Sequence, residues 1–247
     1  MTFKDHFSAQ AELYAQARPT YPVALFEWLA KQCARHDMVW DAGCGNGQAS
    51  VALARYFTDV FASDPSATQI EAAAAHAHVR YAVEPAEQCS LAAASADLVT
   101  VAQALHWFDH ERFYSEVRRV LKPGGVIAAW TYGRSSVTPD IDAVFMGLYE
   151  GVLGAYWPPE RRHIEAGYAT LPFPFAEIAT PELQLRCDWT LPQYLAYLRS
   201  WSASQRFLQA TGRDAVGEFA DALAEVWGDP EKVRAVTWPM HIKAART

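Results

Sequence analysis

The sequence predicts an α/β fold, namely a doubly wound and mostly parallel sheet of seven strands. Three observations indicate this fold. Short apolar runs alternate with helical patterns between residues 38 and 131, an order typical of parallel sheets with right-handed crossovers. A glycine-rich segment, residues 39–48, joins the first apolar run to a helical stretch. The run at 126–131 is apolar throughout, as expected for a strand covered on both faces.

Five strands and the three helices between them are expected in this region. The strands are predicted at 38–42, 60–63, 79–82, 98–102 and 126–131. The helices are predicted at 48–57, 67–75 and 109–121. A turn is expected at 122–125, because Pro123 stops the helix and the two glycines that follow permit unusual dihedral angles.

Helical patterns flank this core on both sides. Pro22 suits the first turn of a helix at 23–35, and we expect residues 1–35 to form an N-terminal helical lid. Residues 134–180 are expected to form a helical insertion after the fifth strand, which lies over the sheet. A helical pattern at 141–153 supports this prediction.

The last part of the chain is expected to complete the sheet. Its patterns predict a strand, two helices and a closing strand at 182–190, 192–207, 215–227 and 236–245. Pro239 favours an edge position or a bulge for the closing strand. We predict one domain, 1–247, whose lid, core, insertion and closing part are 1–35, 36–133, 134–180 and 181–247.

The composition argues against several classes of protein. The 247 residues are 51% apolar, which is ample for a core, and the net charge of −7 argues against a general nucleic-acid binder. No apolar run reaches about 18 residues, the length that spans a membrane. The N-terminus lacks an apolar signal segment, and the four cysteines show no metal-like pairing. We therefore expect a cytoplasmic protein with no metal site, no nucleic-acid partner and no membrane partner.

The glycine-rich segment contains Asp41 followed by glycines at alternate positions, Gly43, Gly45 and Gly47. Glycine is needed where the backbone has a positive φ or lies against a ligand. The dinucleotide motif G-x-G-x-x-G requires its third glycine at position 48, which is glutamine here. A pyrophosphate would also meet the negative charge of Asp41, so the segment suits a ligand with a positively charged amine instead.

Further polar candidates follow other predicted strands. Asp64 ends the second apolar run, where an acid commonly binds ribose hydroxyls. Glu87, Gln103 and His106 also come after strands. Because ligands of open parallel sheets bind outside the carboxyl ends of the strands, we expect these side chains to lie near the glycines.

The D-x-G-x-G-x-G spacing with a strand-end acid resembles the cofactor site of class I S-adenosyl-L-methionine (SAM) methyltransferases. Residues 95–109 and 120–128 match later motifs of that family. Together with the opening segment, 7–22, they are similar to the methyltransferase domain type 11 group, in the branch of trans-aconitate methyltransferase-like proteins. The resemblance covers residues 3–133 well and is weaker for 134–247.

The resemblance implies a Rossmann-like fold, SAM as the cofactor and S-adenosyl-L-homocysteine as the product. It also implies roles for the matching residues. The backbone from Gly43 to Gly47 passes the amino-acid part of SAM, and Asp64 accepts hydrogen bonds from both ribose hydroxyls.

The adenine and methionine parts of SAM have their own implied partners. Pro65 flanks the adenine, and Ala86 and Glu87 meet its edge. Gln103 lies under the methionine part. Relatives often have Asp where this chain has Pro85, so adenine recognition uses Glu87 or the backbone instead.

His106 is the candidate catalytic residue. It follows the strand at 98–102, where the methyl acceptor should approach, and could serve as a hydrogen-bond partner or a base. The alternative is that His106 and Trp107 are a packed aromatic pair. Tyr14, Arg18 and Tyr21, with Trp107, are the other candidates for substrate binding, and their alternative is simple helix packing.

The acceptor is expected to be a small molecule, with a carboxylate as one option. Four arginines flank the expected entrance to the site, and guanidinium groups suit carboxylates; they are Arg18, Arg134, Arg161 and Arg162. The alternative is that they are ordinary solvated charges. Two other functions stay open, a non-catalytic SAM-binding protein and a nicotinamide-dependent oxidoreductase. The sequence does not indicate an oligomeric state.

Overall fold

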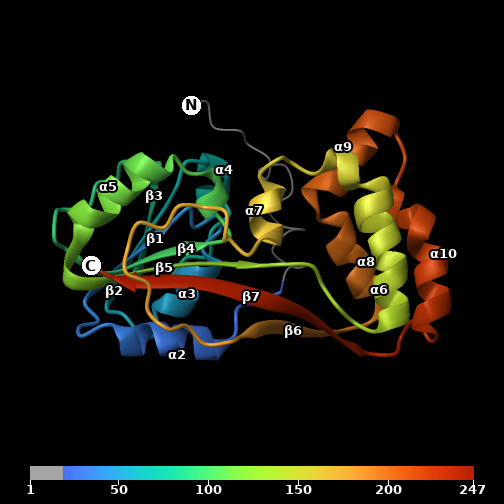
Figure 1. Ribbon diagram of the computed structural model, residues 1–247, viewed down its shortest axis with the longest axis horizontal. Helices are drawn as coiled ribbons and strands as arrows, with labels where there is room; N and C mark the ends of the chain where they lie inside the picture. The colour runs from blue at the N-terminus through green and yellow to red at the C-terminus, as the bar shows by residue number, and fades with distance from the viewer. Residues whose placement is uncertain (1–18) are drawn as a thin grey trace.

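The computed structural model describes residues 19–247 and contains a seven-stranded sheet with flanking helices (Figure 1). The strand order is β3-β2-β1-β4-β5-β7-β6. The first five strands are parallel, and β7 runs antiparallel to both β5 and β6. The strands are β1 Met38–Ala42, β2 Asp59–Asp64, β3 Val79–Val83, β4 Ala96–Ala102, β5 Leu121–Tyr132, β6 Gln184–Trp189 and β7 Arg234–Arg246. The predicted α/β class is therefore confirmed.

Helices cover both faces of the sheet. Successive residues of a strand point to opposite sides, so the apolar strands present two apolar faces for helices to bury. The helices around the parallel strands are α2 Val23–Gln32, α3 Gln48–Leu53, α4 Ala67–Glu71 and α5 His110–Val120. Val126 of β5 packs in one buried cluster with α2 and α3, whereas Ile127 packs in the other with α5. Figure 1 shows α2 below the sheet and α5 above it. The doubly wound arrangement is confirmed.

Helix α2 covers a face of the sheet and is not part of a lid, which corrects the prediction for residues 23–32. Its apolar residues Leu25, Phe26 and Leu29 are buried in the same cluster as Val126. An amphipathic helix must bury its apolar stripe, and the sheet face provides the partner surface. The rest of the predicted lid, residues 1–18, lies outside the described residues.

The turn expected at 122–125 is a bulged part of β5 instead. The strand begins at Leu121, which pairs with Ala96, and the register with β4 shifts between Ala96 and Leu98. Gly124 has a φ of +76°. The bulge accommodates Pro123, which cannot donate to a regular ladder.

After β5 the chain forms a group of helices that we call the helical cluster, seen at the right of Figure 1. Its members are α6 Pro139–Met146, α8 Leu191–Arg199, α9 Ser202–Thr211 and α10 Ala215–Trp227. Helix α6 continues as a π-helical segment, Gly147–Val152. Ile141 of α6 and Leu223 of α10 belong to one buried cluster. The predicted insertion therefore packs against helices from the last part of the chain.

The helix predicted at 192–207 is two helices, α8 and α9. Trp201, between them, has an extended backbone with φ −72° and ψ 141°. Its side chain is 5% exposed, and its ring contacts those of Phe145, Tyr149 and Trp157 at centroid distances of 5.7, 5.7 and 5.4 Å. Burial of this large ring outweighs the helical pattern, as tertiary packing often outweighs propensity.

Strand β7 lies between β5 and β6 in the sheet, whereas Pro239 led us to expect an edge position or a bulge. Residues 240–246 pair with β5, and residues 234–239 pair with β6. The carbonyl of Pro239 accepts from the N–H of Gly133 at 3.2 Å. The nitrogen of Pro239 therefore lies just beyond the end of the ladder between β5 and β7. The missing N–H interrupts no hydrogen bond of that ladder.

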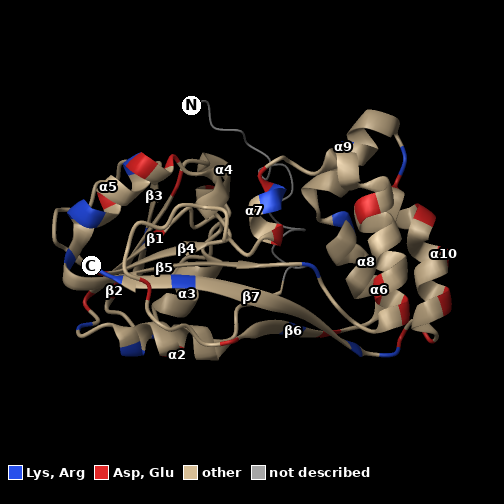
Figure 2. Cartoon of the chain, viewed as in Figure 1, with Lys and Arg blue, Asp and Glu red and all other residues tan. Residues whose placement is uncertain are grey.

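Charged side chains are distributed unevenly over the molecule (Figure 2). Helix α10 contains three acidic and no basic residues. The short helix α7, Arg161–Glu165, begins with two arginines and lies between the sheet and the helical cluster. Within residues 19–247, no helix combines the length and the apolar character that crossing a membrane requires.

Candidate active site

The carboxyl ends of the parallel strands point toward the helical cluster, and the loops at these ends carry the predicted site residues (Figure 1). The strand order reverses between β1 and β4. Ligands of open α/β sheets bind outside the strand ends at such a reversal. The loops that follow β1, β2 and β4 are therefore the place to look for a cofactor site.

The three glycines of the loop after β1 have φ values of +67°, +55° and +83° for Gly43, Gly45 and Gly47. A Cβ on Gly43 would lie 2.7 Å from a neighbouring side-chain carbon, and one on Gly47 would collide with the ring of Tyr81. Among the described residues, a Cβ on Gly45 would meet only Oε1 of Gln69, at 3.7 Å. Gly43 and Gly47 therefore contribute to packing, while Gly45 borders a space that no described residue fills and that we call the open space at Gly45.

Asp64 joins this loop to the end of β2. Its Oδ2 accepts from the N–H of Gly45 at 2.9 Å, and its Oδ1 accepts from the N–H of Ser66 at 2.9 Å. The carboxylate therefore holds the loop after β1 and the loop after β2 together. The structure thus places the predicted strand-end acid beside the open space at Gly45.

Asp41 lies beneath the loop, which corrects the prediction that it faces a positively charged amine. Its carboxylate is 0% exposed. Oδ2 accepts from the hydroxyl of Ser50 at 2.6 Å, and Oδ1 accepts from the hydroxyl of Thr100 at 2.8 Å. Burial raises the pKa of Asp41 to about 6, although both hydroxyls act to lower it. Asp41 therefore ties β1 to α3 and β4.

We expect Asp41→Asn to raise the free energy of unfolding relative to the wild type near pH 7 but not near pH 4. The folded-state pKa of about 6 lies above the unfolded value of 3.8. The folded protein therefore binds the proton more readily, and its stability falls as the pH rises between these two values. Asparagine has no charge to bury, so the variant avoids this loss, which is at most about 3 kcal/mol for two pKa units.

Urea unfolding of both proteins at about pH 4.5 and about pH 7.5 measures this difference in stability. The free energy of unfolding of the wild type at the same two pH values is the internal reference. A difference that does not change with pH would contradict the raised pKa of Asp41.

The residues predicted to surround the adenine take different places. Ala86 is 3% exposed, and Pro65 is half-buried directly after Asp64. Oε1 of Glu87 accepts from the N–H of Asp109 at 2.8 Å, and Asp109 caps the first turn of α5. One oxygen of Glu87 is thus committed to the start of α5.

Gln103 ties the end of β4 to the end of β5. It has a φ of +59°, a conformation that is unfavourable by about 1–2 kcal/mol for residues other than glycine. Its Oε1 accepts a short hydrogen bond from the hydroxyl of Thr131, and its Nε2 donates to the carbonyl of Tyr132 at 3.4 Å. Its amide is therefore turned onto β5.

His106 lies in the short 3₁₀-helix Leu105–Trp107, directly after β4. It is 8% exposed, and its ring centroid is 4.7 Å from that of Trp107. Burial and then the positive charge of Arg161 lower the pKa of His106 to about 3. The imidazole is therefore neutral near pH 7 and is a weak base, which favours its hydrogen-bonding role over the basic one.

Tyr168 is a site residue that the sequence analysis missed. Its hydroxyl lies 3.0 Å from Nδ1 of His106, although the two residues are separated by 62 positions. Tyr168 is 0% exposed and has a φ of +64°. The Gly167-Tyr168 pair after a helical pattern was the available signal, because glycine commonly ends a helix.

The predicted substrate-binding residues are only partly brought together. Tyr21 packs edge-on against Trp130 and Tyr132, at centroid distances of 5.6 and 6.4 Å, which agrees with the packing alternative. Trp107 is half-buried beside His106. Tyr14 and Arg18 lie outside the described residues.

The arginines predicted to border the entrance differ in their surroundings. Arg134 forms an ion pair with Glu150 at 2.9 Å, and both side chains are largely exposed. Arg162 is exposed, so its position agrees with the solvated alternative.

Arg161 is half-buried and lies over the ring of Trp157, with Cζ 4.7 Å from the ring centroid. Its Nε donates to the hydroxyl of Tyr149 at 2.7 Å, and that hydroxyl donates to Glu165 at 2.6 Å. Within the described part of the chain, no carboxylate lies at ion-pair distance from its guanidinium.

Comparison with known proteins adds independent observations. A model of the methyltransferase domain matches residues 40–129, which include the glycine loop and Asp64. A Dictyostelium discoideum protein assigned to the methyltransferases is 33% identical over 248 residues, 97% of this chain and 94% of the relative. The solved structure of an Anaeromyxobacter dehalogenans protein, assigned as a type II methyltransferase, is 49% identical with a TM-score of 0.88. That match covers 93% of this chain and 97% of the other.

An open parallel sheet with a glycine loop after its first strand is typical of proteins that bind a nucleoside-type cofactor. The chain belongs to the class I SAM-dependent methyltransferases and is an enzyme of that family. A Saccharomyces cerevisiae protein assigned as an S-adenosylmethionine-dependent methyltransferase is 28% identical over 63% of this chain and 58% of its own length. The open space at Gly45 and the adjoining carboxylate of Asp64 fit SAM as the cofactor. Membership of the trans-aconitate branch stays a prediction.

Proposed function

We propose that this enzyme transfers a methyl group to a small molecule that presents a carboxylate, near the ends of β4 and β5. SAM supplies, when bound, a methyl group on a positively charged sulfur that is already activated for in-line displacement. The chain mainly has to orient the acceptor and exclude water.

The cofactor is proposed to lie along the glycine loop, with its ribose at Asp64. Gly45 supports this placement because it borders open space. The Gly45 N–H donates to Asp64, so the carboxylate and the loop are held in one arrangement. In this proposal Pro65 and Ala86 adjoin the adenine, and the turn at Gln103 borders the methionine part.

The surroundings of the Arg161 guanidinium are the main support for a carboxylate acceptor. It is half-buried, lacks a carboxylate partner within the described residues, and acts electrostatically on His106. Guanidinium groups bind carboxylates through two parallel hydrogen bonds. An acceptor carboxylate beside His106 would provide the opposite charge that Arg161 lacks among the described residues.

The neutral state of His106 also favours a carboxylate acceptor. A carboxylate is ionised at pH 7 and needs no base before it attacks the methyl group. A phenol or an amine would need to lose a proton, and a histidine with a pKa of about 3 accepts one poorly.

We expect Arg161→Gln to lower kcat/KM for the acceptor by about ten- to a hundredfold while leaving the affinity for SAM nearly unchanged. This range corresponds to the loss of a charged hydrogen bond, worth about 1.5–3 kcal/mol. Labelled SAM with a panel of polycarboxylates, phenols and amines first identifies the acceptor. Titration calorimetry then measures SAM affinity in both proteins.

Arg162→Gln is the matched control, because it removes the same charge from the exposed neighbouring position. Equal losses in both variants would indicate a general field effect rather than a specific contact. Methylation confined to neutral or cationic acceptors would refute the carboxylate while leaving the methyltransferase family unaffected.

A further inference from the structure

Arg161 and Glu165 are the first and last residues of α7, four positions apart. Oppositely charged side chains at this spacing lie on the same face of a helix and commonly form a direct ion pair. These two side chains form no direct ion pair, because the hydroxyl of Tyr149 lies between them. Tyr149 comes from the π-helical segment that continues α6. The helical cluster therefore supplies the group that separates the two charges.

The chemistry of the three groups determines the direction of both hydrogen bonds. A guanidinium nitrogen only donates, so the phenol oxygen of Tyr149 accepts from Nε of Arg161 at 2.7 Å. An ionised carboxylate only accepts, so the phenol hydrogen goes to Oε1 of Glu165 at 2.6 Å. Burial raises the pKa of Tyr149 above its usual range, which keeps this hydrogen on the phenol near pH 7.

The hydrogen bond from Nε determines which edge of the Arg161 guanidinium remains for a ligand. A guanidinium has five N–H groups and binds a carboxylate through two parallel hydrogen bonds along one edge. One such edge combines Nε with an Nη group, and the other combines the two Nη groups. Nε of Arg161 is used by Tyr149, whereas neither Nη group donates to a described residue. The edge formed by the two Nη groups is therefore the one left for a carboxylate.

Two aromatic rings restrict the guanidinium further. Its Cζ lies 4.7 Å from the ring centroid of Trp157 and 5.5 Å from that of Tyr149. Arginine stacks favourably on aromatic faces. Nε1 of Trp157 donates to the backbone carbonyl of Tyr149 at 3.2 Å. Tyr149 thus holds Arg161 directly through its hydroxyl and indirectly through the position of Trp157.

The backbone that carries Tyr149 is unusual. Tyr149 lies within the π-helical segment Gly147–Val152. The N–H of Leu153 donates to the carbonyl of Leu148, five positions earlier, at 2.9 Å. Single π-helical turns are rare and are frequent at functional sites. The segment therefore supports a role for Tyr149 beyond packing.

We propose that Tyr149 is a positioning residue: its hydroxyl keeps Arg161 apart from Glu165 and leaves the two Nη groups to bind the carboxylate of the methyl acceptor. The acceptor would meet a guanidinium whose orientation is fixed before binding, which lowers the entropy cost of binding. This inference rests on the proposed function, because it concerns the same acceptor.

The first test is structural and does not depend on activity. Tyr149→Phe keeps the aromatic ring and removes only the hydroxyl. We expect a crystal structure of this variant to show a direct ion pair between Arg161 and Glu165, with N and O within about 4 Å. A crystal structure of the wild type should show none. An unmoved guanidinium in the variant, or a direct ion pair in the wild type, would overturn the proposal.

The second test is turnover with the carboxylate acceptor that the panel of acceptors identifies. We expect Tyr149→Phe to raise KM for this acceptor about fivefold with a smaller change in kcat. The reason is that a guanidinium paired with Glu165 binds the acceptor less well. The affinity for SAM should be nearly unchanged.

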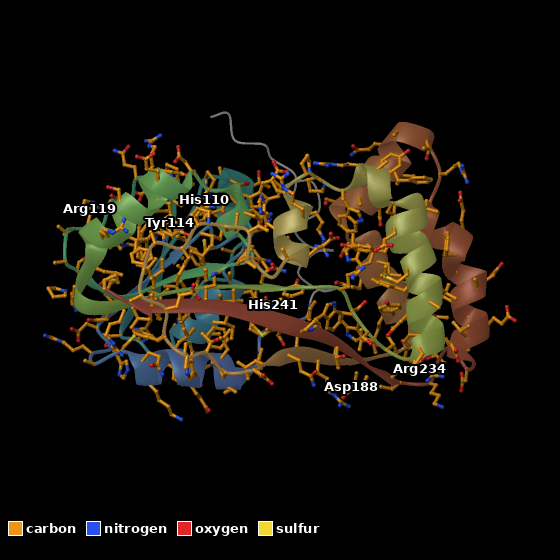
Figure 3. The ribbon with its side chains drawn as sticks, in the orientation of Figure 1. His110, Tyr114, Arg119, Asp188, Arg234 and His241 are labelled. Atoms are coloured by element: carbon orange, nitrogen blue, oxygen red, sulfur yellow. The ribbon has the colours of Figure 1, made fainter. Side chains whose placement is uncertain are left out.

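Tyr114→Phe is the matched control, because it also removes the hydroxyl of a buried tyrosine. That hydroxyl donates to the carbonyl of Pro172 at 2.6 Å, and Figure 3 shows Tyr114 on α5. The control variant should keep the wild-type KM for the acceptor. Equal increases of KM in both variants would overturn the role assigned to Tyr149, because any buried hydroxyl would then have the same effect.

A second substitution separates positioning from packing. Adding Glu165→Gln to Tyr149→Phe removes the charge that competes for Arg161, so KM for the acceptor should return to within about twofold of the wild type. A merely structural role of the hydroxyl predicts no such recovery, and a double variant with the KM of Tyr149→Phe or higher would overturn the proposal. If the wild type binds no SAM or methylates no carboxylate, the proposed function fails, while the crystal structures still decide whether the hydroxyl keeps the two side chains apart.

Discussion

Gly45→Val is expected to abolish SAM binding while leaving the fold in place. The Cβ and its two methyl groups would enter the open space beside the loop, where the nearest described atom is 3.7 Å from the Cβ position. The same space is proposed to hold the amino-acid part of the cofactor. Calorimetry measures the binding, and circular dichroism with thermal unfolding measures the fold.

The positive φ of Gly45 adds a backbone penalty of about 1–2 kcal/mol for any other residue. Gly124→Val controls for it, because Gly124 has a φ of +76° with nothing within 4 Å of its Cβ position. The control variant should lose similar stability and bind SAM normally. Normal binding by a folded Gly45→Val variant would show that the cofactor does not lie along this loop.

Asp64→Ala is expected to weaken SAM binding by at least about tenfold. The change removes the acceptor of the Gly45 and Ser66 N–H groups, both at 2.9 Å, and the proposed acceptor of the ribose hydroxyls. Hydrogen bonds to a charged group are worth about 1.5–3 kcal/mol each, and about 1.4 kcal/mol is a factor of ten. Calorimetry with SAM and with S-adenosyl-L-homocysteine measures the loss.

Asp64→Asn is the control that keeps one side-chain oxygen for the loop but removes the charge. Its affinity should fall between those of the wild type and of Asp64→Ala. A ranking in which the asparagine variant binds as weakly as the alanine variant would show that charge, not loop support, determines the affinity. Unchanged affinity in Asp64→Ala would place the ribose elsewhere.

The parallel part of the fold could be predicted because its signals are local in the sequence. Strand β1 agrees with the prediction at both ends, since an apolar run and a glycine turn mark its limits. The break between α8 and α9 could not be predicted, because it depends on rings that meet Trp201 from distant parts of the chain. Periodicity describes one helix at a time and contains no information on such partners.

The candidate site also combines features that could be predicted from the sequence with features that depend on tertiary contacts. The position of Asp64 beside the glycines follows from the order of elements along the chain. The burial of Asp41 does not, because it requires the hydroxyls of Ser50 and Thr100 to converge on one carboxylate. Tyr168 was missed for the same reason, since only the tertiary fold brings it to His106.

Strand β7 links the stability of the two parts of the molecule. Residues 240–246 complete the ladder with β5, while residues 234–239 form the ladder with β6. Unfolding of the helical cluster would therefore also disturb β7, whose other half pairs with β5 of the parallel sheet. Unfolding should accordingly be cooperative across both parts. The hydrogen bonds of β7 with β5 and β6 would therefore hold the loops at the strand ends and the helices that face them in a fixed relative position.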